Sequence, residues 1–363
     1  MVYYAMALAL FAEEDYEEVI VRLSETLASW GCWDQAWTMP TSGGITQARA
    51  RLGSGPVMQV FEQVAVPVAT LATAGAWLGS WRLMAIDGFG WDVPDTSDNA
   101  AEFDYASAGP NASAFPRARV VTISECASHA VVAAKIGGMR TGEQTLARAL
   151  YPRLEPDWLL IADRNFYGFG DWNAARAGGT QLLWRVAASV TLPVLAAHPD
   201  GSYSSMVINR QIRRGTRDRL IEAARLGEDL DPEQAVRVRV IEYVVPDREG
   251  SRPGDAIVLI TTITDPTQAP AEALAAAYHQ RWEHETGNDQ LKTHLRGPGK
   301  ILRSRKPDTV RQEIYGYLLT HYAISALICR AATEADIDPD RVKFLRTVRI
   351  LRRRVTDPAA FSP

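Results

Sequence analysis

The sequence lacks several features that would assign it quickly to a common class of protein. Cysteine is scarce: Cys32, Cys126 and Cys329 lie far apart, and their spacing fits neither a zinc site nor a disulfide framework. It has no uncharged apolar run of about eighteen residues, as a membrane-spanning helix requires. It also has neither the lysine loop of nucleotide-binding proteins nor a dinucleotide fingerprint. We therefore expect a cytoplasmic protein with no membrane partner and no nucleotide cofactor.

An excess of positive charge is missing as well. The 39 basic residues are outnumbered by 43 acidic ones, which gives a formal net charge of −4. No overall basic field therefore indicates a nucleic-acid partner, although a local basic groove can bind phosphates on an acidic protein. The chain opens on an apolar stretch with no basic n-region and no cleavage site, which predicts a core helix and not a signal peptide.

What the sequence does contain is an ordinary globular composition, with 47% hydrophobic and 23% charged residues, and enough length for two or three domains. Hydrophobic periodicity divides it into five parts. We expect a helical N-terminal domain (1–78), the first part of a mixed α/β core (79–186), an all-β insertion (187–267), the second part of the core with an acidic helix (268–335) and a basic C-terminal tail (336–363).

Within these parts the pattern predicts individual elements. Two β-rich runs with a short polar turn between them predict a hairpin in the first part of the core. Apolar strands are expected to end directly before Asp87 and Asp163. The other elements that matter below are helices, expected at Glu13–Trp30, Val57–Gly75, Glu143–Leu154, Ala271–Leu295 and Thr309–Ala332.

Two aspartates follow apolar strands. Asp87 stands in Ala-Ile-Asp-Gly-Phe and Asp163 in Leu-Ile-Ala-Asp-Arg-Asn-Phe. A carboxylate just past a buried strand lies at the edge of a sheet, where ligands collect. Each aspartate alone is weak evidence, because an aspartate after a strand is more often a turn former or a helix cap.

A third group lies on one predicted helix. Tyr278, Arg281, Glu285 and Lys292 stand at offsets of 0, 3, 7 and 14 residues, which places them on one helical face, whereas Glu283 points to the far side. An acid flanked by cations and a phenol suits a metal ligand beside a phosphodiester. A solvated face with Arg281–Glu285 ion pairs explains the same pattern equally well.

The tyrosine, arginine, glutamate and lysine at this spacing resemble the signature of the DDE transposases of the insertion-sequence-four group. The segments around Asp87 and Asp163 resemble the blocks of the family's first two acids, and they come in the family's order. Both termini look short for the family, which bears on recognition of DNA ends.

The resemblance implies a ribonuclease-H-like core that holds two Mg²⁺ or Mn²⁺ ions on Asp87, Asp163 and Glu285. It implies that Tyr278, Arg281 and Lys292 position a scissile phosphate. The expected reaction is phosphodiester hydrolysis and strand transfer at transposon ends, through a hairpin, by a homodimer bound to double-stranded DNA at the inverted repeats and to target DNA. The N-terminal domain is then expected to bind DNA and, like the basic tail, to be truncated.

Several further residues are candidates for DNA contacts. Trp282 is either a stacking platform for a flipped base or a half-buried helix tryptophan. Arg164 follows the second aspartate directly, and Arg210, Arg213 and Arg214 lie in the insertion, where they line a DNA groove or form a solvated edge. Two other functions stay open: a non-catalytic, DNA-binding remnant that inhibits transposition, and a metal-dependent nuclease that cuts without joining.

Overall fold

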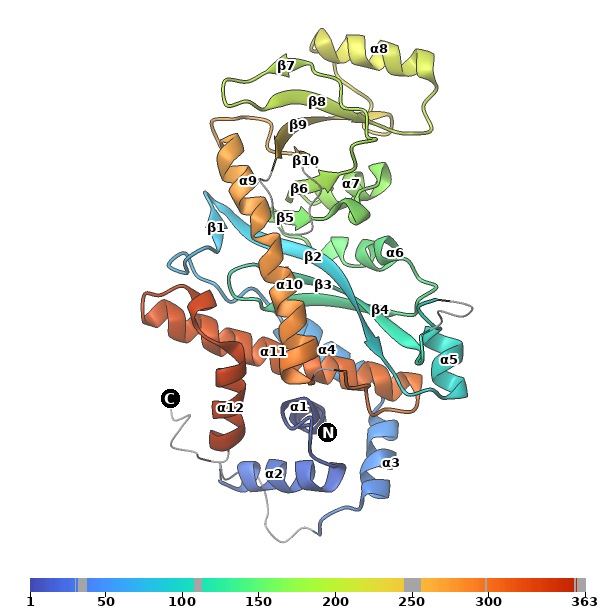
Figure 1. Cartoon of the computed structure of the whole chain (residues 1–363), viewed down its shortest axis with the longest axis vertical. Coiled ribbons are helices and arrows are strands. Elements are labelled where there is room, and N and C mark those ends of the chain that lie inside the picture. Colours follow the sequence, from blue (N-terminus) through green and yellow to red (C-terminus); the bar gives the residue numbers. More distant parts are fainter. Residues whose placement is uncertain are drawn as a thin grey trace. The chain divides into compact units, whose positions relative to one another are not determined.

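Figure 1 shows the chain as a computed structural model, which describes residues 1–29, 31, 38–107, 113–244, 256–297, 299–355 and 357. The fold is mixed α/β, as the sequence predicts. The chain forms two compact units: the first comprises Met1–Gly75, Gly88–Gly142 and Glu285–Pro363, and the second comprises Ala76–Asp87 and Glu143–His284. Strand β2 (Trp81–Asp92) and helix α10 (Arg281–Asp289) each pass from one unit into the other.

The first unit is mainly helical. Its other elements are α1 (Val2–Leu10), α2 (Tyr16–Ser29), α3 (Ser42–Leu52), α4 (Gly55–Val64), α5 (Ser97–Phe103), β3 (Arg117–Glu125), β4 (Val131–Gly137), the π-helix η4 (Gln290–Leu295), α11 (Pro307–Glu334), η5 (Pro339–Arg341) and α12 (Phe344–Arg354). The hairpin predicted from the sequence is confirmed, because β3 and β4 pair antiparallel, with Val120 opposite Ile136.

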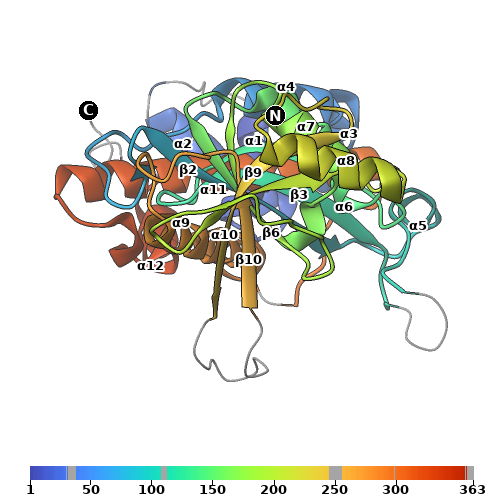
Figure 2. The ribbon, with the colours of Figure 1, turned by 90° about the horizontal axis from the view of Figure 1, so that it is seen from above.

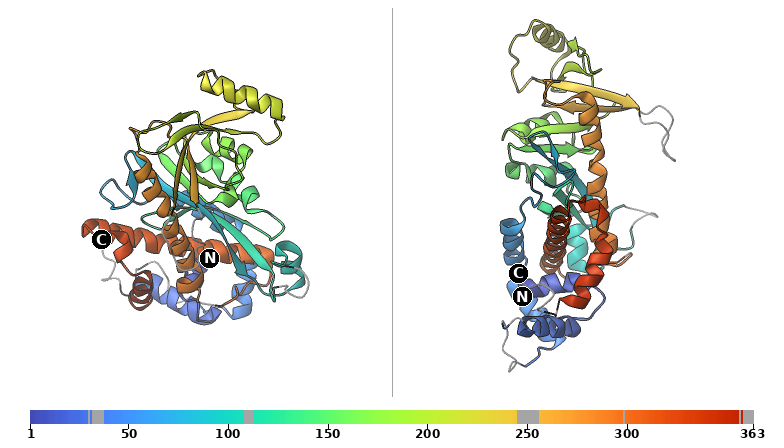
Figure 3. Two further views of the ribbon diagram at one scale, coloured as in Figure 1. Left: turned by 45° about the horizontal axis from the view of Figure 1, so that its top comes forward. Right: turned by 90° about the vertical axis from the view of Figure 1, so that its left-hand side faces the viewer.

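Helix α11 is the centre of the first unit. Ile314, Leu318 and other residues of its buried face share one apolar cluster with α1, α4 and α12. The approach of α1 is so close that a Cβ atom on Gly316 would stand 2.5 Å from the carbonyl oxygen of Ala5. The apolar N-terminal stretch is thus a core helix, as predicted. Figure 3 shows α11 and α12 in red and dark red near the C-terminus.

The second unit is built on a sheet. Its other elements are β1 (Trp77–Leu78), α6 (Glu143–Arg148), η2 (Tyr151–Arg153), β5 (Trp158–Ala162), η3 (Arg164–Phe166), α7 (Phe169–Arg176), β6 (Gln181–Val186), β7 (Ala196–Ala197), β8 (Tyr203–Ile208), α8 (Arg214–Arg225), β9 (Ala235–Val244), β10 (Ala256–Thr261) and α9 (Ala271–His279). Strands β2, β5 and β6 are parallel neighbours, and every residue of β5 is buried, as expected of a strand in the middle of a sheet.

The insertion continues this sheet instead of forming a separate layer. Strand β10 pairs antiparallel with β6, and β9, β8 and β7 follow in that order. The all-β expectation needs correction, because the insertion contains α8. This helix packs Leu220 and Ile221 against Met206 of β8 and Ala235 of β9, and Figure 2 looks down onto it. Its apolar positions are few among arginines and acids, which hid the helical period.

Two of the predicted helices are interrupted in the structure, each near a proline. The helix expected over Val57–Gly75 ends at Val64, because Pro67 follows closely and disfavours helical backbone before it. The helix expected over Glu143–Leu154 divides into α6 and the short η2 at Pro152. Trp30, the last residue of another predicted helix, lies outside the described residues.

Two predictions from the overall composition remain, one on membrane-spanning helices and one on the cysteines. Among the described residues, no helix combines the length and apolar character needed to cross a bilayer. Cys126 and Cys329 are buried, while Cys32 lies outside the described residues.

Candidate active site

The two aspartates come together in the second unit through strand pairing. Ile86 of β2 stands opposite Ala162 of β5 in the parallel register. Asp87 directly follows Ile86, and Asp163 directly follows Ala162. Adjacent strands run about 4.8 Å apart, and neighbours in register point to the same face of a sheet. Both carboxylates are partly exposed. Two carboxylates therefore follow paired positions of neighbouring strands, and carboxylate oxygen is the donor type that divalent cations such as Mg²⁺ prefer.

The strand boundaries around the aspartates differ from each other. Asp163 follows the end of β5 as predicted, and its side chain accepts a hydrogen bond of 2.6 Å from the Arg164 amide. Asp87, however, lies inside β2, which runs on to Asp92. The prediction that a strand ends before Asp87 is wrong, because Phe89 and Trp91 continue the buried alternation beyond it.

Tyr278 of α9 lies within electrostatic range of Asp163. Burial raises the pKa of the Tyr278 phenol to about 12, the Arg281 charge lowers it and the Asp163 carboxylate raises it further. The phenol is 4% exposed, and its hydroxyl makes no well-formed hydrogen bond within the described part of the chain, although the Arg281 side chain lies close enough to interact with it. The Arg281 guanidinium lies 6.0 Å from the centre of the Tyr278 ring. A buried neutral donor and a cation thus accompany Asp163 within the second unit.

Glu285 stands one turn after Arg281 on α10. Because α10 is a regular helix from Arg281 to Asp289, positions four residues apart lie on the same face. The Glu285 side chain is exposed. Glu285 belongs to the first unit, so its meeting with the two aspartates stays a prediction.

Lys292 does not lie on the single continuous helix that the sequence predicts. The single helix expected over Ala271–Leu295 consists of α9, α10 and the π-helix η4, with a turn at Gln280. The regular helical wheel therefore does not extend from Tyr278 to Lys292. In the first unit the Lys292 ammonium lies 5.9 Å from the ring centre of Phe89. Phe89 follows Asp87 by two residues in β2, which places both on one face of that strand.

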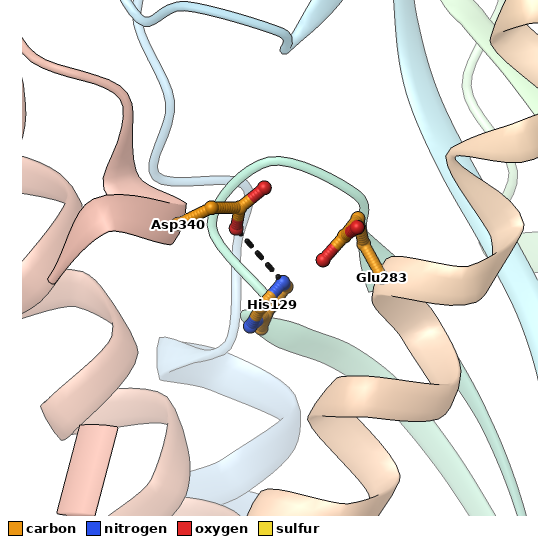
Figure 4. A group of neighbouring side chains, drawn as sticks. All are labelled: His129, Glu283 and Asp340. Carbon is orange, nitrogen blue, oxygen red and sulfur yellow. Dashed lines mark ion pairs between the residues drawn. The ribbon is translucent and has the colours of Figure 1, made fainter. Parts of the chain in front are cut away.

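A buried polar chain holds the end of α10 in the first unit. His321 donates to the Gln290 side-chain oxygen at 3.1 Å, and the Gln290 amide donates to Nδ1 of His129 at 2.9 Å. Nε2 of His129 lies 3.3 Å from Asp340, the ion pair dashed in Figure 4. Gly287 of α10 packs on His129, whose Cβ would be 3.5 Å from a Cβ added to that glycine.

Figure 4 also labels Glu283, which belongs to the second unit. Its side chain is partly buried, whereas the Glu285 side chain is exposed. The two glutamates of α10 thus differ in environment.

Trp282 is part of an aromatic row in the second unit. Its ring centre lies 5.0 Å from that of His279, which in turn lies 5.8 Å from that of Tyr243. The Trp282 side chain is partly exposed. Both interpretations from the sequence, a stacking platform and a half-buried helix residue, are compatible with this position.

The arginines predicted to contact DNA are all exposed. Arg164 opens η3 directly after Asp163. Arg213 caps α8 and Arg214 begins it, so both belong to a helix and not to a strand edge. Arg210 lowers the pKa of Tyr167, which burial raises to about 12. Arg210 therefore lies near the segment that follows Asp163.

Sequence reasoning missed two features, one in each unit. Arg185 of β6 lowers the pKa of Tyr278 and so belongs to the same surroundings. An arginine within the otherwise mostly apolar strand β6 was the available signal. The chain of His129, Gln290 and His321 gave no signal, because its members lie far apart in the sequence and none belongs to a recognisable motif.

Two family models match the chain. "Insertion element 4 transposase N-terminal" matches residues 1–62, and "Transposase DDE domain" matches residues 81–322. The chain is 28% identical over 327 residues to the transposase InsG for insertion sequence element IS4 of Escherichia coli K12, an alignment that spans 88% of this chain and 67% of that protein.

Other similarities are weaker. The putative transposase InsZ of the same organism is 29% identical over 125 residues, which is 34% of this chain and 42% of that protein. Among solved structures, a piggyBac transposase synaptic complex with hairpin DNA aligns with 99% of this chain and 82% of its own, at a TM-score of 0.44 and 10% identity.

Proposed function

Because the chain belongs to the insertion element 4 family of DDE transposases, we propose that it catalyses cut-and-paste DNA transposition. In this proposal the enzyme hydrolyses phosphodiester bonds at the transposon ends and joins the freed ends to target DNA. It does so through a hairpin at the transposon end. No covalent protein–DNA intermediate and no serine, tyrosine or histidine nucleophile is required.

The observation that carries the proposal is the pairing of β2 with β5. It brings Ile86 and Ala162 into register, so that Asp87 and Asp163, far apart in the sequence, directly follow paired positions of neighbouring strands. Two adjacent carboxylates repel each other unless a cation or a proton compensates them. Their partial exposure leaves them accessible to a cation and to a phosphate group. These donors fit Mg²⁺ or Mn²⁺, which take oxygen ligands.

Glu285 is the proposed third ligand, and the three acids hold two divalent ions in the working enzyme. When bound, these ions supply activation of the attacking water or DNA hydroxyl and stabilisation of the leaving oxygen. The exposed Glu285 lies one turn after Arg281, which already accompanies Asp163 and Tyr278 in the second unit. Glu283 is two positions away, about 200° around the helix, and takes no part.

The neighbouring side chains position the scissile phosphate. Arg281 and Lys292 bind its oxygens through charge-assisted hydrogen bonds. The Tyr278 hydroxyl stays protonated at any physiological pH, since its pKa is about 12, and it donates a hydrogen bond to the DNA backbone. Because this buried hydroxyl makes no well-formed hydrogen bond to the described residues, DNA binding would satisfy it. Trp282 stacks on a base that leaves the helix when the hairpin forms.

The partners follow from this chemistry. We propose double-stranded DNA at the inverted repeats as the first substrate and target DNA as the second, bound by a homodimer. The helical N-terminal domain and Arg164, Arg210, Arg213 and Arg214 contact the DNA backbone, for which exposed guanidinium groups are suited. The chromosomal substrate and the buried thiols suit a cytoplasmic location.

A strand-joining assay tests this function. The chain is incubated with Mg²⁺, a labelled duplex carrying the inverted repeat found beside its gene, and a target plasmid. We expect joined products from the native chain and none from Asp163→Asn. Loss of a metal ligand should slow cleavage by more than about a hundred-fold, the upper end of the effect of residues that only support ligands. Asp157→Asn, a change at an exposed turn before β5, should leave the rate unchanged.

The products separate the alternatives. Nicks without joined products would replace the transposase by a nuclease, and a shifted but uncut band would indicate a DNA-binding remnant. Normal cutting by Asp163→Asn would show that the proposed metal site is wrong.

A further inference from the structure

Helix α12 has two faces of opposite character. Phe344, Val348 and Leu351 face the apolar cluster of the first unit, and this contact explains why the segment is helical. Arg346, Arg349 and Arg353 are exposed. None of these three arginines forms an ion pair within the described residues. They differ in this respect from Arg140 and Arg330 of the same unit.

The comparison with two other arginines of the same unit makes the difference clear. Arg330 binds Glu334 at 2.9 Å, and Arg140 binds Asp104 at 2.6 Å. Those ion pairs offset each charge locally. On α12 the charges of consecutive turns add up without such compensation, apart from Arg354, which binds Asp357 at 3.0 Å.

The arginines surround a hollow. It has a volume of about 610 Å³, and the described residues that line it are Arg346, Arg349, Arg352 and Arg353. No carboxylate is among these lining residues. A concave surface lined by charges of one sign concentrates the field and attracts ions of the opposite sign. The hollow therefore favours an anionic ligand.

Arg352 is the lining residue that hydrogen bonds to backbone carbonyl groups hold in place. Its Nε donates to the carbonyl oxygen of Leu10 at 2.6 Å, and a second nitrogen donates to that of Leu295 at 3.4 Å. The nearby Glu13 already binds Lys300 at 3.1 Å, and Glu14 binds Arg22 at 3.2 Å. Both carboxylates also lie within electrostatic range of Arg352, so they offset part of its charge, but Arg346, Arg349 and Arg353 have no ion-pair partner among the described residues.

We propose that this hollow, which the α12 arginines define, binds the sugar–phosphate backbone of DNA as a contact separate from the acidic site. From Arg346 to Arg353 the helix rises by about 10 Å. This length is enough for the arginines to reach more than one phosphate of a DNA strand, which presents one about every 3.4 Å along the duplex axis. Guanidinium groups bind phosphate oxygens in pairs, and the described residues that line the hollow are all arginines. Every nucleotide carries the same phosphate, so the proposed contact is independent of sequence. This inference rests on the proposed function, because it takes DNA as the partner.

The test measures DNA affinity against salt concentration. The variant Arg346→Ala/Arg349→Ala is compared with Arg140→Ala/Arg330→Ala, which removes the same charge from paired, exposed positions of the unit. Fluorescence anisotropy follows binding to an inverted-repeat duplex and to a scrambled duplex of equal length, without Mg²⁺. For the α12 variant we expect about ten-fold weaker binding to both duplexes and a salt slope smaller by about 2. The control pair should keep the native slope.

A second variant keeps the test independent of folding. Arg346→Lys/Arg349→Lys retains the charge, so its salt slope should match that of the native chain while its thermal unfolding is unchanged. A native slope in the alanine variant would overturn the inference, and so would a loss confined to the inverted-repeat duplex. These results are distinct from failure of the proposed function, which would appear as normal cleavage by Asp163→Asn in the joining assay.

Discussion

The Asp163 carboxylate and the Tyr278 phenol influence each other, although they come from distant parts of the sequence. Burial is the largest cause of the raised pKa of Tyr278, Arg281 opposes it, and Asp163 adds to it. The strand end that carries the second aspartate therefore faces the helix that carries the first residue of the tyrosine–arginine–glutamate–lysine signature. Within the second unit, the segment of Asp163 and the segment of Tyr278, which are far apart in the sequence, therefore lie close to each other.

The first prediction concerns the Tyr278 hydroxyl. Tyr278→Phe should leave the thermal unfolding temperature unchanged or slightly higher, because the buried hydroxyl makes no well-formed hydrogen bond to the described residues of the free protein. The same variant should cleave transposon-end DNA about ten-fold or more slowly, since a hydrogen bond to a charged phosphate contributes about 1.5–3 kcal/mol. Calorimetry and a single-turnover cleavage assay measure the two effects.

Tyr151→Phe is the matched control for this prediction. The Tyr151 hydroxyl is also buried in the second unit without a hydrogen-bond partner among the described residues. Its loss should change neither stability nor cleavage. Equal slowing by both variants would show that the Tyr278 hydroxyl acts only through packing of the unit, and it would remove Tyr278 from the phosphate-positioning group.

The second prediction separates two glutamates on α10. Glu285→Gln should abolish Mg²⁺-dependent cleavage, because a neutral amide is a poor ligand for a hard cation. Glu283→Gln should retain most of the activity, since Glu283 points about 200° away around the helix. Both variants should bind DNA and unfold near the native temperature. Equal damage from the two substitutions would contradict the argument that one face of α10 carries the chemistry.

Much of the second unit was predictable from the sequence. Strand β5 and the position of Asp163 at its end follow from a short, fully apolar run, and the hairpin of β3 and β4 follows from two β-rich runs. Helix α8 was missed, because its few leucine, isoleucine and alanine positions lie among arginines and acids that make the segment strongly polar on average. The end of β2 was also misjudged, since Gly88 and Gly90 obscured its continuing alternation.

The candidate site also has parts that the sequence predicts and parts that it does not. Asp87, Asp163 and Glu285 stay predictions from their motifs, and the contact of Tyr278 with its surroundings depends on how α9 packs in the second unit. The π-helix after Asp289 could not be foreseen, because a wheel of 100° per residue assumes an uninterrupted α-helix. Arg185 enters the surroundings of Tyr278 only through the order of the strands.

The third prediction concerns acid stability of the second unit. Burial alone would raise the pKa of Asp200, but hydrogen bonds from Ser202 and the Ala271 amide and the charge of Arg239 outweigh it and lower the pKa to about 2. Because this value lies below the unfolded value of about 3.9, the stabilisation is complete above about pH 4. It is lost as the pH falls toward 2.

Asp200→Asn tests this relation. Arg239 is fully buried, so loss of its partner should destabilise the unit by about 3 kcal/mol at neutral pH. The variant should also lose part of the acid dependence of its unfolding free energy between pH 4 and 2, as measured by urea titration. Asp229→Asn, a change in an exposed loop, should match the native chain at every pH. An unaltered acid profile in Asp200→Asn would refute the assignment.

The fourth prediction concerns the packing of α1 on α11. Replacing glycine by alanine inside a helix normally stabilises it by about 1 kcal/mol. Gly316→Ala should instead destabilise the first unit by about 1–3 kcal/mol, because the added Cβ would lie 2.5 Å from the Ala5 carbonyl oxygen, a backbone atom that moves only with α1. Gly55→Ala in α4 meets open space and should leave stability unchanged or raise it. Urea unfolding monitored by circular dichroism compares the two, and a gain of stability in both would mean that α1 does not lie against α11 in solution.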